Sequence, residues 1–203
     1  MNTILYKSLP KDMSPNGHLF KVGKWYKEDN ISICNRGFHA SKRAIDAMGY
    51  VNCEVLAKVE VRGESEKQED KQCWSEMRLI KTYKWTKKDS IALSIYSAEL
   101  CLKNFEKEYP NDDRPRKAIE AAKAVLEKGT KKNRDAAESA ARSAAGSARS
   151  AWSAAESAAE SAAGSARSAA GSAVRSARSA AYEKGLEKTL NKINKWILKR
   201  VNL

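Results

Sequence analysis

Histidines and paired cysteines, which build most zinc sites, are scarce in this sequence. It has two histidines among 203 residues, and its four cysteines lie about twenty or more positions apart without a CxxC pair. The pattern therefore argues against a structural zinc site. We expect free thiols in a reducing cytoplasm at all four positions, Cys34, Cys53, Cys73 and Cys101.

Long apolar runs, proline and glycine are scarce as well. The chain has 4 Pro and 10 Gly, and hydrophobic residues make up 42% of it. This composition excludes collagen-like, proline-rich and wholly disordered proteins. No apolar run approaches the roughly 20 residues of a membrane-spanning helix, and the first residues do not resemble a secretory signal. The sequence predicts a folded, soluble protein of the cytoplasm without a membrane partner.

The common catalytic motifs are missing, whereas positive charge is abundant. There is no P-loop, GxGxxG, GxSxG or HExxH motif. The 38 Lys and Arg residues against 25 Asp and Glu residues give a net charge of +13. Such an excess favours an anionic partner, which could be a nucleotide, a nucleic acid or an acidic protein.

Residues 1–105 have the pattern of a β-rich α+β domain that ends in a joining helix. The clearest strand is Cys53–Val61, where apolar and polar side chains alternate. Shorter strands are expected at four places, 3–6, 19–25, 31–34 and 77–83. Turn residues occupy 14–17, and 63–72 reads as a charged loop. A short helix over Ala44–Met48 is expected, with Ser41 as its cap.

Helical spacing begins at Asp89, which together with Ser90 is a candidate cap for the joining helix. Residues 106–203 are predicted to form a separate, alanine-rich helical domain. In its first helix we expect Asp113 as the cap, Pro115 in the first turn and Gly129 as the stop. Its last helix has one apolar face, made of Leu186, Leu190, Ile193, Ile197 and Val201.

Between these helices lies a segment rich in alanine and serine. Residues 135–182 hold 21 Ala and 12 Ser in 48 positions. The twelve serines span 40 residues in 11 steps, a mean spacing of 3.64 residues, which is close to the period of an α-helix. The segment therefore reads as one continuous helix or as antiparallel helices broken at Gly146, Gly164 and Gly171, and the unbroken serine phase favours the first.

An alanine face buries little apolar area, so such a helix needs a close neighbour. A continuous helix over 135–182 would be about 72 Å long, which is too long to pack on a domain of about 110 residues. We therefore predict that the alanine-rich helices mediate a homo-oligomer.

Two groups of residues are candidate anion ligands. Around Arg36, His39 and Ser41, the end of a strand meets the start of a helix, where backbone N–H groups can hold an anion. Lysines and aromatic rings also alternate over 21–26, a pattern suited to stacking a base above a phosphate. A turn-holding histidine and ordinary core aromatics are the structural alternatives. The predicted ligand-binding set is Lys7, Lys21, Lys24, Trp25, Tyr26, Arg36, His39 and Ser41.

Three motifs together resemble a known family. They are Leu5-Tyr6-Lys7, the run Ile33-Cys34-Asn35-Arg36-Gly37-Phe38-His39-Ala40, and the strand end Val59-Glu60-Val61-Arg62-Gly63-Glu64. The combination is similar to an uncharacterised domain of many bacteriophage and prophage proteins. In those proteins the domain is often followed by a motif like that of 113–121 and by an alanine-rich tail similar to immunity proteins. The resemblance implies a phage-type protein acting in the cytoplasm of a host cell.

The order of elements also resembles that of ADP-ribosyltransferases. A first strand with Tyr6, a later Gly-Phe-x-x-Ser before a helix and a strand near Glu76 follow that order. This resemblance implies an NAD-using site with Glu76, Tyr6 and His39 as catalytic residues. Lys7 stands where those enzymes carry His or Arg, and Trp74-Ser75-Glu76 replaces their Glu-x-Glu or Gln-x-Glu, so we expect a version that binds without catalysis.

The leading hypothesis is therefore a non-enzymatic binding protein without a cofactor. It would inhibit a host process, such as a defence system, by capturing an anionic ligand like a nucleotide-derived signal, or by binding a host defence protein or another macromolecule. The alternatives are an ADP-ribosyltransferase-like enzyme, a structural helical oligomer and a nucleic-acid-binding protein.

Overall fold

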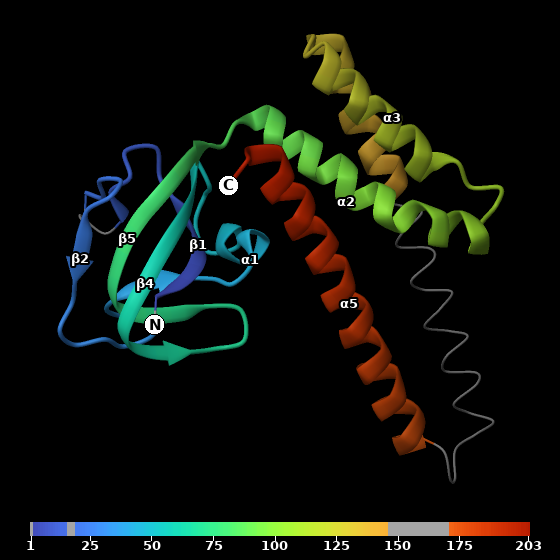
Figure 1. Cartoon of the computed structure of the whole chain (residues 1–203). Helices are drawn as coiled ribbons and strands as arrows, with labels where there is room; N and C mark the ends of the chain where they lie inside the picture. The colour runs from blue at the N-terminus through green and yellow to red at the C-terminus, as the bar shows by residue number, and fades with distance from the viewer. Residues whose placement is uncertain (1, 16–18, 146–170) are drawn as a thin grey trace. The chain divides into compact units, whose positions relative to one another are not determined.

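The computed structural model describes residues 2–15, 19–145 and 171–203, and for 171–183 the backbone only. Along the chain (Figure 1) the named strands and helices are β1 (Thr3–Leu9), β2 (Trp25–Lys27), β3 (Phe38–Ala40), α1 (Ala44–Met48), β4 (Val55–Lys67), β5 (Gln72–Lys84), α2 (Lys87–Glu108), α3 (Arg114–Glu127) and α5 (Gly171–Val201). Residues 131–145 are helical too. An antiparallel sheet followed by helices confirms the predicted α+β class.

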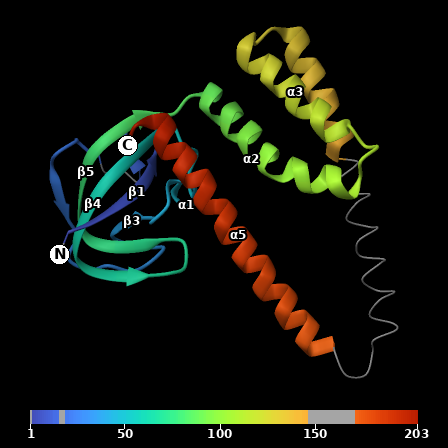
Figure 2. The ribbon, with the colours of Figure 1, turned by 45° about the vertical axis from the view of Figure 1, so that its right-hand side comes forward.

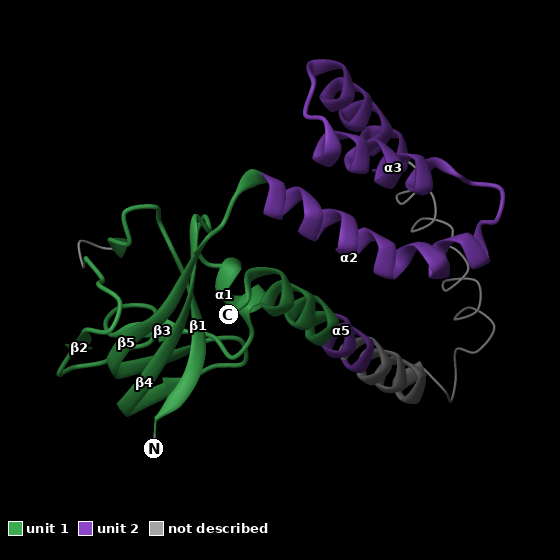
Figure 3. Ribbon diagram, turned by 45° about the horizontal axis from the view of Figure 1, so that its top comes forward, with its two compact units in different colours: residues 1–87, 190–203 green, residues 88–189 purple. Residues whose placement is uncertain are grey.

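The chain divides into two compact units, which Figure 3 colours separately. Unit 1 consists of Met1–Lys87 together with the C-terminal segment Leu190–Leu203, and unit 2 consists of Lys88–Thr189. The end of the chain therefore belongs to the same unit as its beginning.

Unit 1 is built on a curled antiparallel sheet with the strand order β1-β4-β5-β2, to which β3 adds by pairing with the start of β5. Just after β3, Ser41 and Tyr6 of β1 exchange two backbone hydrogen bonds of 2.8 Å. Strand β3 and the residue after it therefore link β5 to β1. This closure holds β3 beside β1 (Figure 2).

The long β4–β5 hairpin curves because its register shifts twice, once between Lys58 and Val59 and again between Arg62 and Ser65. At the second shift Gly63 has a φ of +84°, and a Cβ there would lie 2.2 Å from the Ser75 hydroxyl oxygen. Glycine is the residue that adopts this backbone conformation without steric cost. The Ser75 hydroxyl accepts a 2.9 Å hydrogen bond from the Glu64 N–H, which fixes the bulge.

The core of unit 1 contains the apolar residues that alternate with polar ones in the sequence of β4. Val55, Ala57, Val59 and Val61 are buried, and they share one cluster with buried residues of the neighbouring strands. Those neighbours are Leu5, Leu9, Phe38, Ala40, Met77 and Leu79. Leu56 and Glu60, which alternate with these residues, are buried as well, so the expected water-exposed face of β4 is wrong at these two positions.

Three expected local structures are wrong. The stretch 63–72 is not a loop throughout, because β4 continues to Lys67 and β5 begins at Gln72. All of 62–70 is exposed, so no apolar face marked the strand. Strands were also expected at 19–25 and 31–34, where only Val22 and Ser32 make isolated bridges ahead of β2 and β3. The expected turn at 14–17 falls partly outside the described residues.

The helix caps also differ from expectation. Helix α1 starts after Arg43 without a side-chain cap, and the Asn194 side chain of α5 accepts the Ala44 N–H at 2.7 Å instead. Ser41 is occupied in the bridge to Tyr6. Helix α2 begins at Lys87, so Asp89 lies in its first turn. Asp113 does stand at the N-cap of α3, with Pro115 in the first turn, but its side chain makes no capping hydrogen bond.

Unit 2 is helical, and two described stretches of the alanine-serine segment, 135–145 and 171–182, form helix as predicted. Whether the helix is continuous over 146–170 lies outside the described residues. In the C-terminal helix, Ile193, Ile197 and Val201 are buried as expected, whereas Leu186 is 46% exposed. Among the described helices, none combines the length and hydropathy that crossing a membrane requires.

Candidate functional site

A cavity of about 320 Å³ opens in unit 1 where β3 joins β1. We call it the β1–β3 cavity. Its wall includes Lys7, His39 and Ser41 of the predicted ligand set, together with Tyr6. The other side is formed by the turn before β3, by the residues after α1 and by Lys71 at the start of β5. Small-molecule sites commonly begin at about this volume.

Lys7 supplies the first positive charge of the cavity. Its ammonium nitrogen Nζ donates a 2.7 Å hydrogen bond to the backbone carbonyl of His39. Burial disfavours the charged form and lowers the pKa of Lys7 to about 8, and the neighbouring Cys73 opposes this shift. Within the described part of the chain, no carboxylate forms an ion pair with Lys7. The ammonium group is therefore charged at pH 7 without an anionic partner.

His39 is held in place through both its backbone and its ring. Its ring nitrogen Nε2 accepts a 2.9 Å hydrogen bond from the Cys34 N–H, which requires an unprotonated Nε2. Burial lowers the pKa of His39, and the positive charges of Lys7 and Lys71 lower it further. A hydrogen bond to the backbone of Gly37 and the nearby Glu66 carboxylate act in the opposite direction. The imidazole is therefore neutral at pH 7.

A second lysine and an aromatic ring form the rim of the cavity. The Lys71 ammonium nitrogen donates to the Cys34 sulfur at 3.0 Å and lies 4.7 Å from the centroid of the Tyr50 ring. Tyr50 is 47% exposed and its neighbour Val51 is 41% exposed. No ion pair to Lys71 occurs among the described residues either, so the cavity has two unpaired ammonium groups.

The turn before β3 depends on a glycine. Gly37 has a φ of +106°, and a Cβ on it would lie 2.6 Å from the sulfur of the buried Cys73. The Cys73 thiol donates to the carbonyl oxygen of Arg36 at 3.1 Å, which ties the turn to β5. A side chain at Gly37 would displace this turn, and with it the position of His39 and Cys34 at the cavity.

The remaining residues of the predicted set lie elsewhere. Arg36 does not line the cavity, and its Nε pairs with Glu28 at 2.8 Å. The Tyr26 ring packs on Phe20 with the centroids 5.0 Å apart, and its hydroxyl donates to the carbonyl of Leu19 and accepts the Lys21 N–H. The fold thus uses the Tyr26 ring for packing.

Lys24 and Trp25 lie with Tyr26 near β2 and not at the cavity. Lys24 lies over the Tyr26 ring at 5.2 Å. The Trp25 ring has the Arg62 guanidinium 4.1 Å and the Arg78 guanidinium 5.0 Å from its centroid. The protein's own arginines thus stack on this ring, as a ligand cation would.

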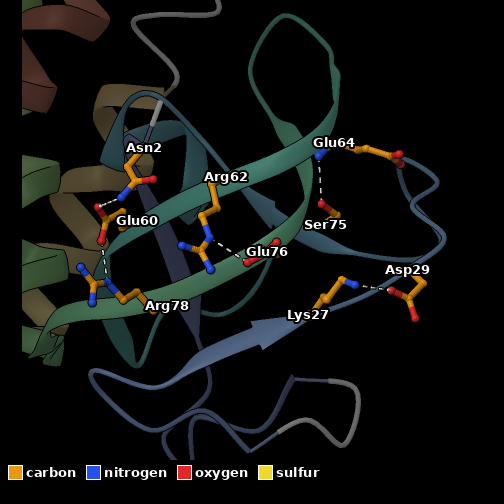
Figure 4. Close-up of polar contacts among 9 residues, drawn as sticks. All are labelled: Asn2, Lys27, Asp29, Glu60, Arg62, Glu64, Ser75, Glu76 and Arg78. Carbon is orange, nitrogen blue, oxygen red and sulfur yellow. Dashed lines mark hydrogen bonds and ion pairs between the residues drawn. The ribbon is translucent and has the colours of Figure 1, made fainter.

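Glu76 belongs to the same polar network on the sheet, which Figure 4 shows. Its carboxylate accepts a 2.7 Å hydrogen bond from Arg62, while Arg78 and Asn2 bind Glu60. These contacts, first that of Arg78, lower the pKa of Glu60 below its usual range. Glu76 does not line the cavity that contains Tyr6 and His39. The three residues of the hypothetical enzyme site are therefore not gathered around one cavity.

Most of the lining residues were missing from the sequence-based set, among them Cys34, Tyr50 and Lys71. Lys71 stands in a charged stretch that offered no signal, and it reaches the cavity because β3 pairs with β5, placing His39 opposite Cys73. No group of three or more His, Cys, Asp or Glu side chains suited to a metal ion occurs in the portion of the chain that the structure describes.

Comparison with family models supports the two-part organisation. Residues 3–89 match the model described as "Domain of unknown function (DUF7666)", and residues 83–196 match the model described as "Imm-5 like putative immunity protein". The expected order, an N-terminal domain of unknown role followed by an immunity-like helical region, is thus confirmed. Neither the curated proteins nor the solved structures contain a match to this sequence. Because the second model covers more than half of the residues, the chain belongs to the Imm-5-like immunity protein family.

Proposed function

We propose that this protein is a non-enzymatic, immunity-type binding protein that captures a small anionic ligand in the β1–β3 cavity. One observation carries the proposal: Lys7 and Lys71 line the same cavity, and neither forms an ion pair with a carboxylate of the described chain. The family assignment supports the immunity role.

The physical argument concerns the unused capacity of Lys7. An ammonium group has three N–H donors and no acceptor, and burying it without a counter-charge is unfavourable. In this structure one of its donors is used by the neutral carbonyl of His39. An anion in the cavity would accept the remaining donors and restore the pKa of Lys7 toward its ordinary value. Binding of an anion thus offsets the unfavourable free energy of burying the Lys7 ammonium group.

A phosphate-bearing, nucleotide-derived signal is the ligand class that we favour. A phosphate group accepts hydrogen bonds from several donors at once, which suits a cavity lined by two lysines. Removing such a signal from solution would inhibit the process that depends on it. The resemblance to bacteriophage proteins makes a host defence system the process that we propose as the target.

The enzyme alternative receives less support from the geometry. It requires Glu76 to act beside Tyr6 and His39, whereas Glu76 is bonded to Arg62 away from the cavity wall. We therefore expect Glu76→Gln to leave ligand capture within twofold of the unchanged chain. A loss of function with this variant would favour the enzyme reading.

Calorimetric titration of the full chain with inorganic phosphate and with ribose 5-phosphate tests the proposal. We expect Lys7→Met to abolish binding of both probes. Lys84→Met is the matched control, because this exposed lysine at the end of β5 does not line the cavity. Equal binding by the unchanged chain and by Lys7→Met, or no binding of either probe, would overturn the proposal.

Native mass spectrometry of the purified chain provides a second test of the proposal. We expect a phosphate-containing molecule to accompany the unchanged protein and to be missing from Lys7→Met. A molecule retained equally by both proteins would contradict capture in this cavity.

A further inference from the structure

We propose that Tyr50 is a stacking platform for a planar ring, so that the ligand is a phosphate ester of mononucleotide size with its ring on Tyr50. This inference rests on the proposed function, since it assumes that the phosphate lies at Lys7. It goes further by assigning the part of the cavity that Tyr50 and Val51 line and by naming a residue that determines specificity.

The first step is the position of the ring. Tyr50 follows α1 directly, lines the cavity and is nevertheless 47% exposed. Val51 beside it is 41% exposed and lines the same cavity. An exposed aromatic ring next to an exposed valine leaves apolar surface in water, and a planar ligand ring would cover it.

The second step is the rigidity of the ring. Burial and a hydrogen bond to Asp70 raise the pKa of Tyr50 to about 12. The hydroxyl is thus protonated at neutral pH. A tyrosine side chain has only two rotatable bonds, so it loses little conformational entropy when a ligand stacks on it.

The third step is the way in which charge and ring surface are combined. Lys71 lies 4.7 Å from the centroid of the Tyr50 ring, so in this structure the ring is in contact with one of the two ammonium groups of the cavity. Its flexible side chain can turn from the ring to a phosphate when a base takes its place. Lys7, on β1, supplies the other ammonium group.

The fourth step is size. A volume of about 320 Å³ is near the lower limit for small-molecule sites, which range from about 300 to 1,000 Å³. It suits one ring and one phosphate group better than a dinucleotide or a strand of nucleic acid. The cavity therefore points to a mononucleotide-sized ligand.

The test compares AMP with ribose 5-phosphate, which has the same sugar phosphate but no base. Stacking of a base on an aromatic side chain corresponds to roughly 5- to 150-fold in affinity. In calorimetric titrations we expect AMP to bind the full chain tighter than ribose 5-phosphate by a factor in this range. Tyr50→Ala should bring the ratio of the two affinities close to one.

Tyr50→Phe is the matched variant, because it keeps the ring and removes only the hydroxyl. It should retain at least half of the AMP preference, expressed as the logarithm of the affinity ratio. Thermal unfolding of both variants verifies that they fold, which we expect because the residue lies at the surface.

The outcomes separate this inference from the proposed function. If both probes bind in a Lys7-dependent way but with equal affinity, or if Tyr50→Ala keeps the preference for AMP, the stacking platform is refuted while anion capture stands. If neither probe binds in a Lys7-dependent way, the proposed function itself fails.

Discussion

The ammonium nitrogen of Lys7 lies 2.7 Å from the carbonyl oxygen of His39 and joins β1 to β3 at the wall of the cavity. The bond unites a charged donor with a neutral acceptor in a place where water is limited. Stability and ligand capture therefore make opposite demands on Lys7, because the buried charge that weakens the fold is the one that attracts an anion.

Replacing Lys7 by Met should stabilise the ligand-free protein at pH 7. The lowered pKa, about 8 in place of 10.5, corresponds to a penalty of about 3 kcal/mol for the charged form. The lost hydrogen bond to His39 offsets about 1 kcal/mol of this. Urea unfolding should show Lys7→Met more stable by up to about 2 kcal/mol. A decrease of more than about 1 kcal/mol would mean that Lys7 serves the fold.

The same pKa predicts how this difference depends on pH. Between about pH 8 and 10.5 the unfolded chain binds a proton at Lys7 that the folded chain does not, so the unfolding free energy rises with pH. The penalty is complete below pH 8 and disappears toward pH 10.5. Measured against Lys7→Met from pH 7 to 10, the unchanged chain should therefore gain stability. A constant difference would contradict a lowered pKa.

The affinity for an anion should depend on pH in the opposite sense and fall where the stability rises. Deprotonation of Lys7 above pH 8 removes one positive charge from the cavity, so phosphate affinity should fall as the pH rises through this range. Titrations from pH 6 to 9 in buffers of equal ionic strength measure this. An affinity that increases above pH 8 would exclude Lys7 from the site.

Gly37→Ala should destabilise the protein more than Gly23→Ala. Both glycines have positive φ, but a Cβ at Gly23 meets nothing within 4 Å, whereas one at Gly37 lies 2.6 Å from the Cys73 sulfur. We expect a loss of about 1 kcal/mol at Gly23 and at least about 2 kcal/mol at Gly37 in urea unfolding. Removing the sulfur with Cys73→Ala should recover part of the second loss. Equal losses would show that backbone strain alone acts at both positions.

Asn194→Ala should destabilise unit 1 because it removes the acceptor of the Ala44 N–H at the start of α1. An unpaired backbone donor in this position costs about 1 to 3 kcal/mol. Asn191→Ala is the control, since Asn191 is exposed on the same helix and the change in helix propensity is the same. The difference between the unfolding free energies of the two variants, measured with denaturant, gives the contribution of the Asn194 cap. A difference below about 0.5 kcal/mol would show that water replaces the Asn194 oxygen.

Local patterns predicted the elements whose faces differ in polarity. The alternation along β4, the helical spacing from Asp89 and the serine period of 3.64 residues each led to the correct type of element where the structure describes it. Such patterns failed for residues 63–67, because an exposed strand has no apolar face to reveal it. They also failed at Ser41, whose backbone N–H and carbonyl pair with Tyr6 in a strand bridge, so that the residue does not cap α1.

The amino-acid sequence by itself determined the α+β class, the excess of positive charge and the helical nature of the alanine-serine segment at its described ends, because each depends on composition or on neighbours in the chain. The tertiary structure alone decided that Lys7, His39, Tyr50 and Lys71 share one cavity, while Arg36, Trp25 and Glu76 do not. The physical reason is strand pairing: β3 lies between β1 and β5, so residues more than sixty positions apart meet through hydrogen bonds that no local pattern records.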